Sequence, residues 1–239
     1  MEKQTEKTKK QTSVATTQNN LPSMPTSDTN WGLEDITQTD LVLPRIMLTQ
    51  FMSELVTAEL AKAGEFRDSL ETSKLLGDAK NPIELIVFGT SKAWIVFKDG
   101  DFLNMEARTA VNDKLPLKET LEDGSFIERK GVLNVNCLLT SDMKKGEAFP
   151  YVVSFKGMST GAGKKLITQL MKLQMFGKPI SAKTFKLKTN LEENDKGKYY
   201  VMDVDMGRDT TTEESQAAQT WHKMLMTKKN VTVDNIGEE

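Results

Sequence analysis

Residues Met158–Lys165 of this 239-residue chain read MSTGAGKK, a pattern that partly matches a phosphate-binding loop at the start of a helix. A Walker A loop needs a glycine where Met158 stands and a hydroxyl where Lys165 stands, so we do not expect nucleotide hydrolysis. The free N–H groups at a helix start, with Lys164 and Lys165 in the first turn, still predict a site for a backbone phosphate.

Asp203 and Asp205 lie two residues apart on an expected strand, so their carboxylates share one face. Such a pair could hold Mg²⁺ in a nuclease, an alternative that stays open beside that of an acidic strand end before a helix N-terminus. The chain has one cysteine, Cys137, and one histidine, His222. These counts exclude a disulfide, a Cys/His zinc site and Ser-His-Asp or Cys-His catalysis, unless His222 acts alone. We therefore expect a non-enzymatic protein with no cofactor and no metal.

The charge is unevenly distributed along the chain. The formal net charge is −2, but residues 142–198 contain 12 lysines, no arginine and 5 acidic residues, a local charge of +7. The remainder of the chain therefore carries −9. A basic block of this kind is either a solvated, solubilising face or a surface that engages phosphate backbones.

Side-chain alternation favours the phosphate interpretation. Period 2 places Trp94 on the same strand face as Lys92 and Lys98, and it places Lys186 and Lys188 together on another strand. Cations that follow phosphates and rings that stack on bases are typical of single-strand binding, although Trp94 could equally be a core residue. The expected nucleic-acid-binding residues are Lys92, Trp94, Lys98, Lys156, Lys164, Lys165, Lys186, Lys188 and Tyr199.

Hydrophobic periodicity predicts three hairpins and two main helices. Short β-rich runs separated by turn residues predict the strand pairs, and apolar side chains at helical spacing predict the helices. The residues near 211–214 read TTEE, a capping signal. The expected hairpins are 83–88 with 93–97, 132–139 with 150–156, and 182–189 with 198–205; the expected helices are 159–176, 211–225 and a short one within 46–61.

The element order predicts a mainly β, α+β fold: an OB-type antiparallel barrel with one inserted helix and a C-terminal helix. Residues 1–30 are polar and predict a disordered N-terminal arm, 41–228 a single OB-like domain, and 229–239 a short flexible acidic tail. No apolar run is long enough to span a bilayer, and the first 30 residues lack the apolar segment of a signal peptide. We expect a soluble protein of the cytoplasm, that of the host cell if the chain is phage-encoded.

Four short stretches resemble parts of bacteriophage single-stranded-DNA-binding proteins of the replication and recombination region. They are LPRIML at 43–48, AGEFRDS at 63–69, STGAGKKL at 159–166 and NDKGKYYV at 194–201. The resemblance covers about residues 41–225. It implies an OB-type fold and binding without catalysis beside phage polymerase, helicase or nuclease. Some relatives carry a cysteine cluster that suggests zinc, and this chain has only Cys137.

We therefore expect sequence-tolerant binding of single-stranded DNA in phage DNA replication and recombination. A single-strand annealing recombinase, the Mg²⁺-dependent nuclease and an adaptor for host proteins remain alternatives. The partners expected are single-stranded DNA and phage replication proteins that contact the C-terminal tail, with no membrane. Homo-oligomerisation is left open.

Overall fold

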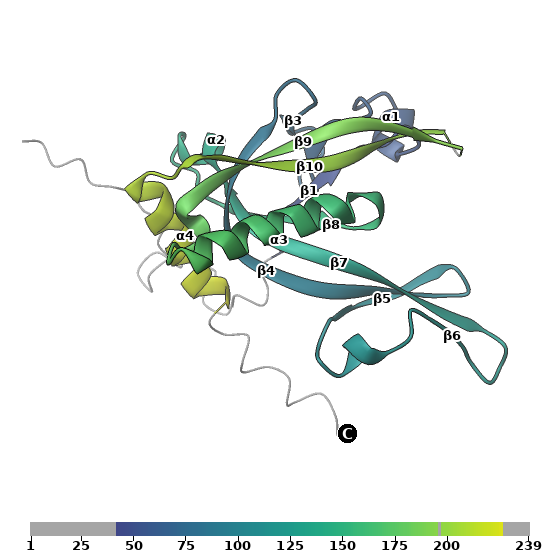
Figure 1. Ribbon diagram of the computed structural model, residues 1–239. Helices are drawn as coiled ribbons and strands as arrows, with labels where there is room; N and C mark the ends of the chain where they lie inside the picture. The colour runs from purple at the N-terminus through teal and green to yellow at the C-terminus, as the bar shows by residue number, and fades with distance from the viewer. Residues whose placement is uncertain (1–41, 196, 227–239) are drawn as a thin grey trace, which may run out of the picture.

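One strongly curled sheet of ten strands organises the residues that the structure describes, 42–195 and 197–226 (Figure 1). In this computed structural model the strands follow the order β10-β9-β4-β7-β8-β1-β2-β3, with β5 beside β4 and β6 beside β7. Every pairing is antiparallel except that of β1 with β8, and the sheet bends into a half-barrel. The prediction of a mainly β fold with helices is confirmed, whereas the predicted arm 1–30 and tail 229–239 lie outside the described residues.

The strands are β1 (Arg45–Leu48), β2 (Phe66–Asp68), β3 (Leu75–Gly77), β4 (Ile83–Lys98), β5 (Asp101–Ala107), β6 (Lys118–Thr120), β7 (Phe126–Leu139), β8 (Pro150–Phe155), β9 (Lys183–Asn194) and β10 (Gly197–Asp209). The helices are α1 (Glu54–Thr57), α2 (Thr140–Met143), α3 (Thr160–Met175) and α4 (Thr212–Met226), with 3₁₀ turns η2 (Asn112–Lys114), η3 (Gly157–Ser159) and η4 (Ile180–Ala182). No helix within the described ranges is long and apolar enough to cross a membrane.

Strand β4 corrects one of the expected hairpins. Residues 83–98 form one continuous strand, so the prediction of a turn at 89–91 is wrong. The pairing with β7 shifts register between Val87 and Gly89, so that β4 has one residue more than β7 at this point. Strand β7 is long enough to pair with β4 on both sides of this shift, and β4 therefore continues through it. The chain instead turns at Asp99-Gly100, where both residues have positive φ, the backbone that an Asp-Gly hairpin turn requires.

The other two expected hairpins are confirmed. Strand β7 pairs with β8 from Leu133 opposite Phe155 to Leu138 opposite Pro150, and β9 pairs with β10 over nearly their full length. The sequence did not predict β1, β2, β3, β5 or β6, which are short or exposed.

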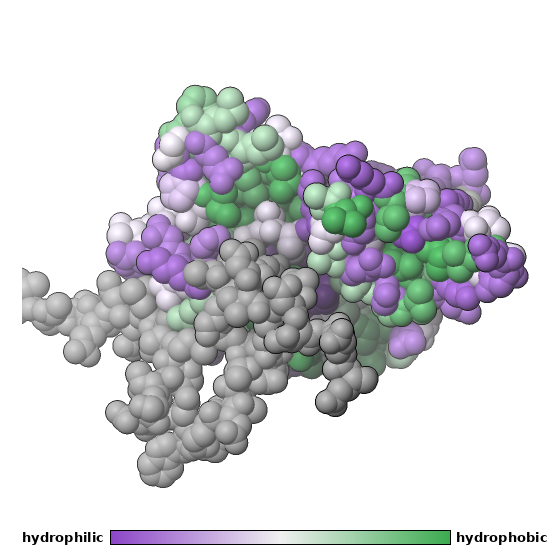
Figure 2. Space-filling model, turned by 90° about the horizontal axis from the view of Figure 1, so that it is seen from below, coloured by the Kyte–Doolittle hydropathy of each residue, from purple (hydrophilic) through white to green (hydrophobic). Residues whose placement is uncertain are grey.

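The arm built by β5, β6 and the ends of β4 and β7 carries exposed apolar side chains among hydrophilic ones, on the right of the view in Figure 2.

Helix α3, confirmed close to its expected bounds, lies between the β9–β10 hairpin and strands β4, β7 and β8 (Figure 1). Its buried face carries Leu166, Leu170 and Leu173, which join the main core inside the curl of the sheet. Gly163 permits the close approach, since a Cβ there would lie 2.8 Å from the Cβ of Phe155. Gly163, the second glycine of the MSTGAGKK sequence, therefore serves helix–sheet packing.

Helix α4 covers the opposite face of the sheet. Alternation along β4 sends Ile86 and Phe88 to that face, where they pack against Ala217, Ala218 and Trp221. The expected capping signal is confirmed as a reciprocal capping box. The backbone N–H of Thr211 donates to Glu214 Oε2 at 2.9 Å, and that of Glu214 donates to Thr211 Oγ1 at 3.2 Å.

The two residues that the sequence singled out by their rarity have structural positions. Nδ1 of His222 lies 2.6 Å from the carbonyl oxygen of Phe88, which places the ring against β4. Cys137 on β7 is fully buried, and burial raises the pKa of its thiol far above the usual range. A thiol in this state is a core residue, because the reactive form of cysteine is the thiolate.

Candidate nucleic-acid-binding groove

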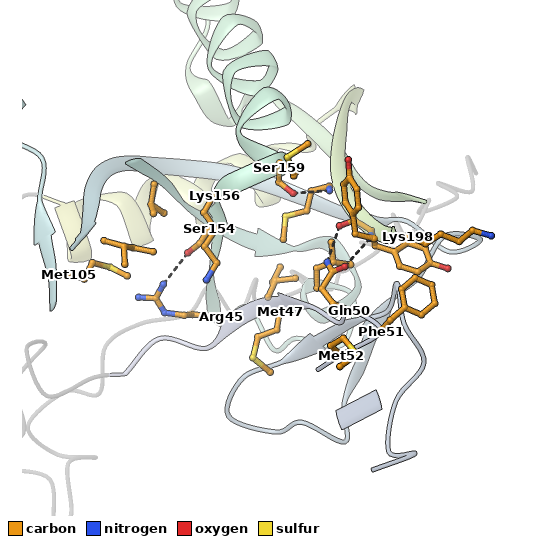
Figure 3. A pocket seen from close by; sticks show the side chains of 18 residues that line it. Arg45, Met47, Gln50, Phe51, Met52, Met105, Ser154, Lys156, Ser159 and Lys198 are labelled. Carbon is orange, nitrogen blue, oxygen red and sulfur yellow. Dashed lines mark hydrogen bonds between the residues drawn. The ribbon is translucent and has the colours of Figure 1, made fainter. Parts of the chain in front are cut away.

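A groove of about 760 Å³ crosses the structure where β1 separates from β8 (Figure 3). In Figure 3, Met105 of β5 lies at one end of the groove, and Phe51 and Lys198 lie at the other. Strand β1 and the residues after it form one wall, and the segment from Ser154 to Ser159 forms the other. The lining residues are Arg45, Ile46, Met47, Leu48, Gln50, Phe51, Met52, Ile95, Met105, Val132, Ser154, Lys156, Met158, Ser159, Lys198, Tyr199, Tyr200 and Met202.

The groove exists because β1 pairs with β8 over only two residues, Arg45 and Ile46, before the chain turns towards β10. Gln50 then bridges the gap with its side-chain amide. Its Nε2 donates to the carbonyl of Tyr200 at 2.9 Å, and its Oε1 accepts the N–H of Tyr200 at 2.9 Å. The Ser159 hydroxyl accepts the N–H of Met202 at 3.0 Å. Side chains thus satisfy backbone groups on the outer edge of β10 where another strand would otherwise pair.

Three cations line the groove, and none of its described lining residues is acidic. Arg45 Nη1 donates to Ser154 Oγ at 3.0 Å, a contact that leaves the rest of its guanidinium available. Lys156 is exposed and makes no ion pair within the described ranges. Lys198 lies 4.0 Å from Glu193, the longest of the recorded ion pairs. A concave surface with one sign of charge attracts anions.

Aromatic rings and thioethers form the apolar part of the lining. The rings of Phe51 and Tyr200 lie with centroids 5.5 Å apart, tilted by 33°. Phe51 is 42% exposed, Met52 88% and Met158 63%. Flat rings and flexible thioethers can contact any base face, because neither requires a particular hydrogen-bonding edge.

Of the nine residues expected to bind nucleic acid, Lys156 and Tyr199 line the groove. Lys92, Lys164 and Lys186 are exposed elsewhere, and Lys98 pairs with Asp123 at 3.6 Å. The groove residues that the sequence did not single out include Arg45, Phe51, Lys198, Tyr200 and the five methionines. Apart from the adjacent Lys198-Tyr199-Tyr200 after a turn, no local signal connects them.

Lys165 and Lys188 belong to an ion-pair cluster with the two aspartates of β10. Lys165 Nζ lies 2.9 Å from Asp203 Oδ1 and 2.8 Å from Asp205 Oδ1, and Lys188 also bonds to Asp205. Hydrogen bonds from Lys165 and then Lys188 lower the pKa of Asp205 to about 2. Both carboxylates face ammonium groups, and the described residues contain no group of three or more metal-ligand side chains. The excess charge of residues 142–198 is thus partly neutralised in space.

Trp94 is a core residue, the alternative that the sequence had left open. Its side chain is 3% exposed and packs with Val96 and Ile127. The guanidinium of Arg108 covers the ring at 4.3 Å from its centroid. The ring therefore presents no open face for stacking on a base.

The structure thus combines a curled, mainly antiparallel sheet with a cationic groove. A family model described as Pam3 phage gp34-like protein matches residues 10–231. This chain belongs to the Pam3 phage gp34-like family, which confirms the expected phage origin. No curated protein and no solved structure matches it.

Proposed function

We propose that this chain binds single-stranded DNA without catalysis and with little sequence preference, in the replication or recombination of phage DNA. The observation that carries the proposal is the groove, which combines Arg45, Lys156 and Lys198 with rings and thioethers and has no acidic lining residue among those described. Cations that follow the phosphates and aromatic surfaces that stack on bases are the two components of sequence-tolerant single-strand binding.

Strand connectivity supports an OB-type arrangement as the finer description of the fold. Strands β4, β7 and β8 follow one another as antiparallel neighbours, α3 comes next, and β9 and β10 form a hairpin that returns to β4. The long, bulged β4 pairs with both β7 and β9, as the first strand of such a unit would. The barrel is open between β8 and β10, and β1 with Gln50 occupies that opening.

The position of the groove agrees with this arrangement. OB-type folds bind oligonucleotides across their second and third strands, between the loop that joins strands 1 and 2 and the loop that joins strands 4 and 5. Those strands are β7 and β8 here, which contribute Val132 and Ser154. The two loops correspond to the arm after β4, which contributes Met105, and to the β9–β10 hairpin, which contributes Lys198 and Tyr199.

In the proposed mode of binding, Arg45, Lys156 and Lys198 contact phosphates, while Phe51 and Tyr200 contact bases. Arg45 donates to the Ser154 hydroxyl, which itself donates to Asn134 Oδ1 at 2.7 Å, so the guanidinium is directed towards the groove wall that Ser154 forms. Lysine and arginine contacts to phosphate carry no sequence information, and stacking is tolerant of base identity.

The test is fluorescence anisotropy with a labelled oligo-dT, comparing the wild-type chain with a triple variant, Arg45→Gln, Lys156→Gln and Lys198→Gln. The matched control replaces three exposed lysines outside the groove, Lys164, Lys172 and Lys178, and changes the net charge by the same amount. We expect the groove variant to lose most of its affinity and the control to lose little. Equal losses in both variants, or no binding of oligo-dT by the wild-type chain, would contradict the proposal.

A further inference from the structure

A second, smaller pocket adjoins the groove at Tyr200, which lines both. Its volume is about 250 Å³, and its wall on the groove side is Tyr200. The other lining residues come from the segments before β2 and after β3: Lys62, Ala63, Gly64, Glu65, Asp78, Ala79 and Lys80. Tyr200 is thus the residue that lines both cavities.

Gly64 fixes the ring that separates the two cavities. Its backbone has φ +88°, and a Cβ placed there would lie 2.6 Å from Cε1 of Tyr200. The ring therefore lies against the bare backbone of Gly64, with Phe51 next to it in the groove. The backbone of Tyr200 is held by Gln50, so both its main chain and its ring have defined positions.

The two acidic residues of this pocket are already engaged by neighbouring groups. Asp78 Oδ1 accepts the backbone N–H groups of Lys80 at 2.8 Å and Asn81 at 2.7 Å. Glu65 Oε2 accepts the backbone N–H of Lys62 at 3.0 Å and bonds to the Arg67 guanidinium at 2.6 Å. These contacts leave the carboxylates turned towards the main chain and the guanidinium.

The lysine side chains of the pocket are exposed, and each ammonium lies close enough to a pocket carboxylate to attract it, Lys62 to Glu65 and Lys80 to Asp78. Neither ammonium lies within ion-pair distance of a carboxylate in the part of the chain that the structure describes. Lys198 lines the groove, Lys62 and Lys80 line the smaller pocket, and Tyr200 lines both. Cations are thus present in both of the cavities that Tyr200 joins.

We propose that the pocket of Lys62, Lys80 and Tyr200 is a second subsite, which binds the phosphodiester backbone of a single strand as it leaves the groove. This inference rests on the proposed function, because the groove must hold the strand first. Its two lysines would neutralise two further phosphates and lengthen the bound segment. On single strands two contacts add about 1.4 to the slope of log K against log salt.

The experiment measures the affinity for oligo-dT as a function of its length, for the wild-type chain and for the double variant Lys62→Gln and Lys80→Gln. The control is a double variant of equal charge on α3 and the turn after it, Lys172→Gln and Lys178→Gln. We expect the subsite variant to bind the shortest oligonucleotide that fills the groove as the wild type does. With longer oligonucleotides it should fall progressively behind, and its salt slope should be smaller by about 1.4. Circular dichroism verifies that each variant is folded.

Three results would overturn the subsite while leaving the groove intact. The first is an unchanged affinity of the double variant for long oligonucleotides. The second is an equal loss of affinity at every length, and the third is an equal loss in the α3 control. The absence of any wild-type binding would instead remove the proposed function itself, so the two failures are distinguishable. A Lys156→Gln variant, which acts in the groove, should lose affinity at every length.

Discussion

Replacing Lys156 by glutamine isolates the electrostatic part of the groove. Lys156 directly precedes η3, its side chain is exposed, and it makes no ion pair within the described ranges. Its removal should therefore leave the fold unaffected. Lys172→Gln on α3 is the matched control, because Lys172 is an exposed lysine of the same basic segment that does not line the groove.

The expected magnitude follows from the number of groove cations. Each phosphate neutralised on a single strand contributes about 0.7 to the fall of log K with log salt. With an oligo-dT just long enough to fill the groove, the three cations Arg45, Lys156 and Lys198 therefore give a slope of about −2.1. Between 50 and 200 mM salt the wild-type chain should lose affinity roughly 20-fold. In Lys156→Gln only Arg45 and Lys198 remain, so the slope becomes about −1.4 and the loss of affinity over the same salt range falls to roughly 7-fold.

The assay is a salt titration of labelled oligo-dT binding by fluorescence anisotropy, with the unfolding free energy of each variant measured in urea. Lys156→Gln should show the smaller slope at unchanged stability, and Lys172→Gln should retain the wild-type slope. If the two variants have the same slope, the affinity arises from overall charge, and the assignment of Lys156 to a phosphate is refuted.

Three further substitutions test other parts of the structure. Trp94→Ala should lower the unfolding free energy in urea by about 3–5 kcal/mol and leave the oligo-dT affinity of the folded protein unchanged; a loss of affinity at unaltered stability would show that the ring contacts DNA. Asp205→Asn should lower stability at pH 7 by less than about 1 kcal/mol, because its ion pairs are partly exposed and screened. Since the pKa of Asp205 is lowered to about 2, its contribution is present above the unfolded pKa near 4 and is lost as pH falls through about 2. The unfolding free energies of the wild type and of Asp205→Asn, measured in urea, should therefore converge as the pH is lowered. A difference that stays constant with pH would contradict this cause. Gly64→Ala should displace Tyr200, lower stability by about 1 kcal/mol or more and weaken oligo-dT binding, whereas Gly161→Ala, in the open first turn of α3, should be neutral or stabilising; similar behaviour of the two variants would refute the role of the positive φ at Gly64.

Local sequence signals were sufficient where an element depends on its own residues. The TTEE sequence predicted the capping box of α4, and helical spacing predicted α3, because both depend on contacts within a few residues. The turn predicted at 89–91 failed because pairing with the long β7 outweighed the local preference of Gly89.

The charge of residues 142–198 shows the limit of counting along the chain. The count ended at residue 198, whereas Asp203, Asp205 and Asp209 follow on the adjacent strand and pair with lysines of that block. Antiparallel pairing of β9 with β10 places Lys188 opposite Asp203 and Lys186 opposite Asp205. Only the register of the hairpin reveals that part of the basic surface is neutralised.

The groove could not be predicted, because its two walls come from distant parts of the sequence. Gln50 and Tyr200 are separated by 150 residues, and their two hydrogen bonds connect the segment after β1 to β10. Trp94 is covered by Arg108, the residue directly after β5, and alternation within β4 cannot indicate this interaction.

Photocrosslinking tests the central claim most directly. An oligo-dT that carries 5-bromodeoxyuridine is irradiated with the full chain, and the adducts are mapped by mass spectrometry. Binding in the groove predicts adducts at Phe51, Tyr199 or Tyr200. Adducts confined to exposed aromatic residues outside the groove, such as Phe102 (64% exposed) or Phe176 (80% exposed), would contradict it.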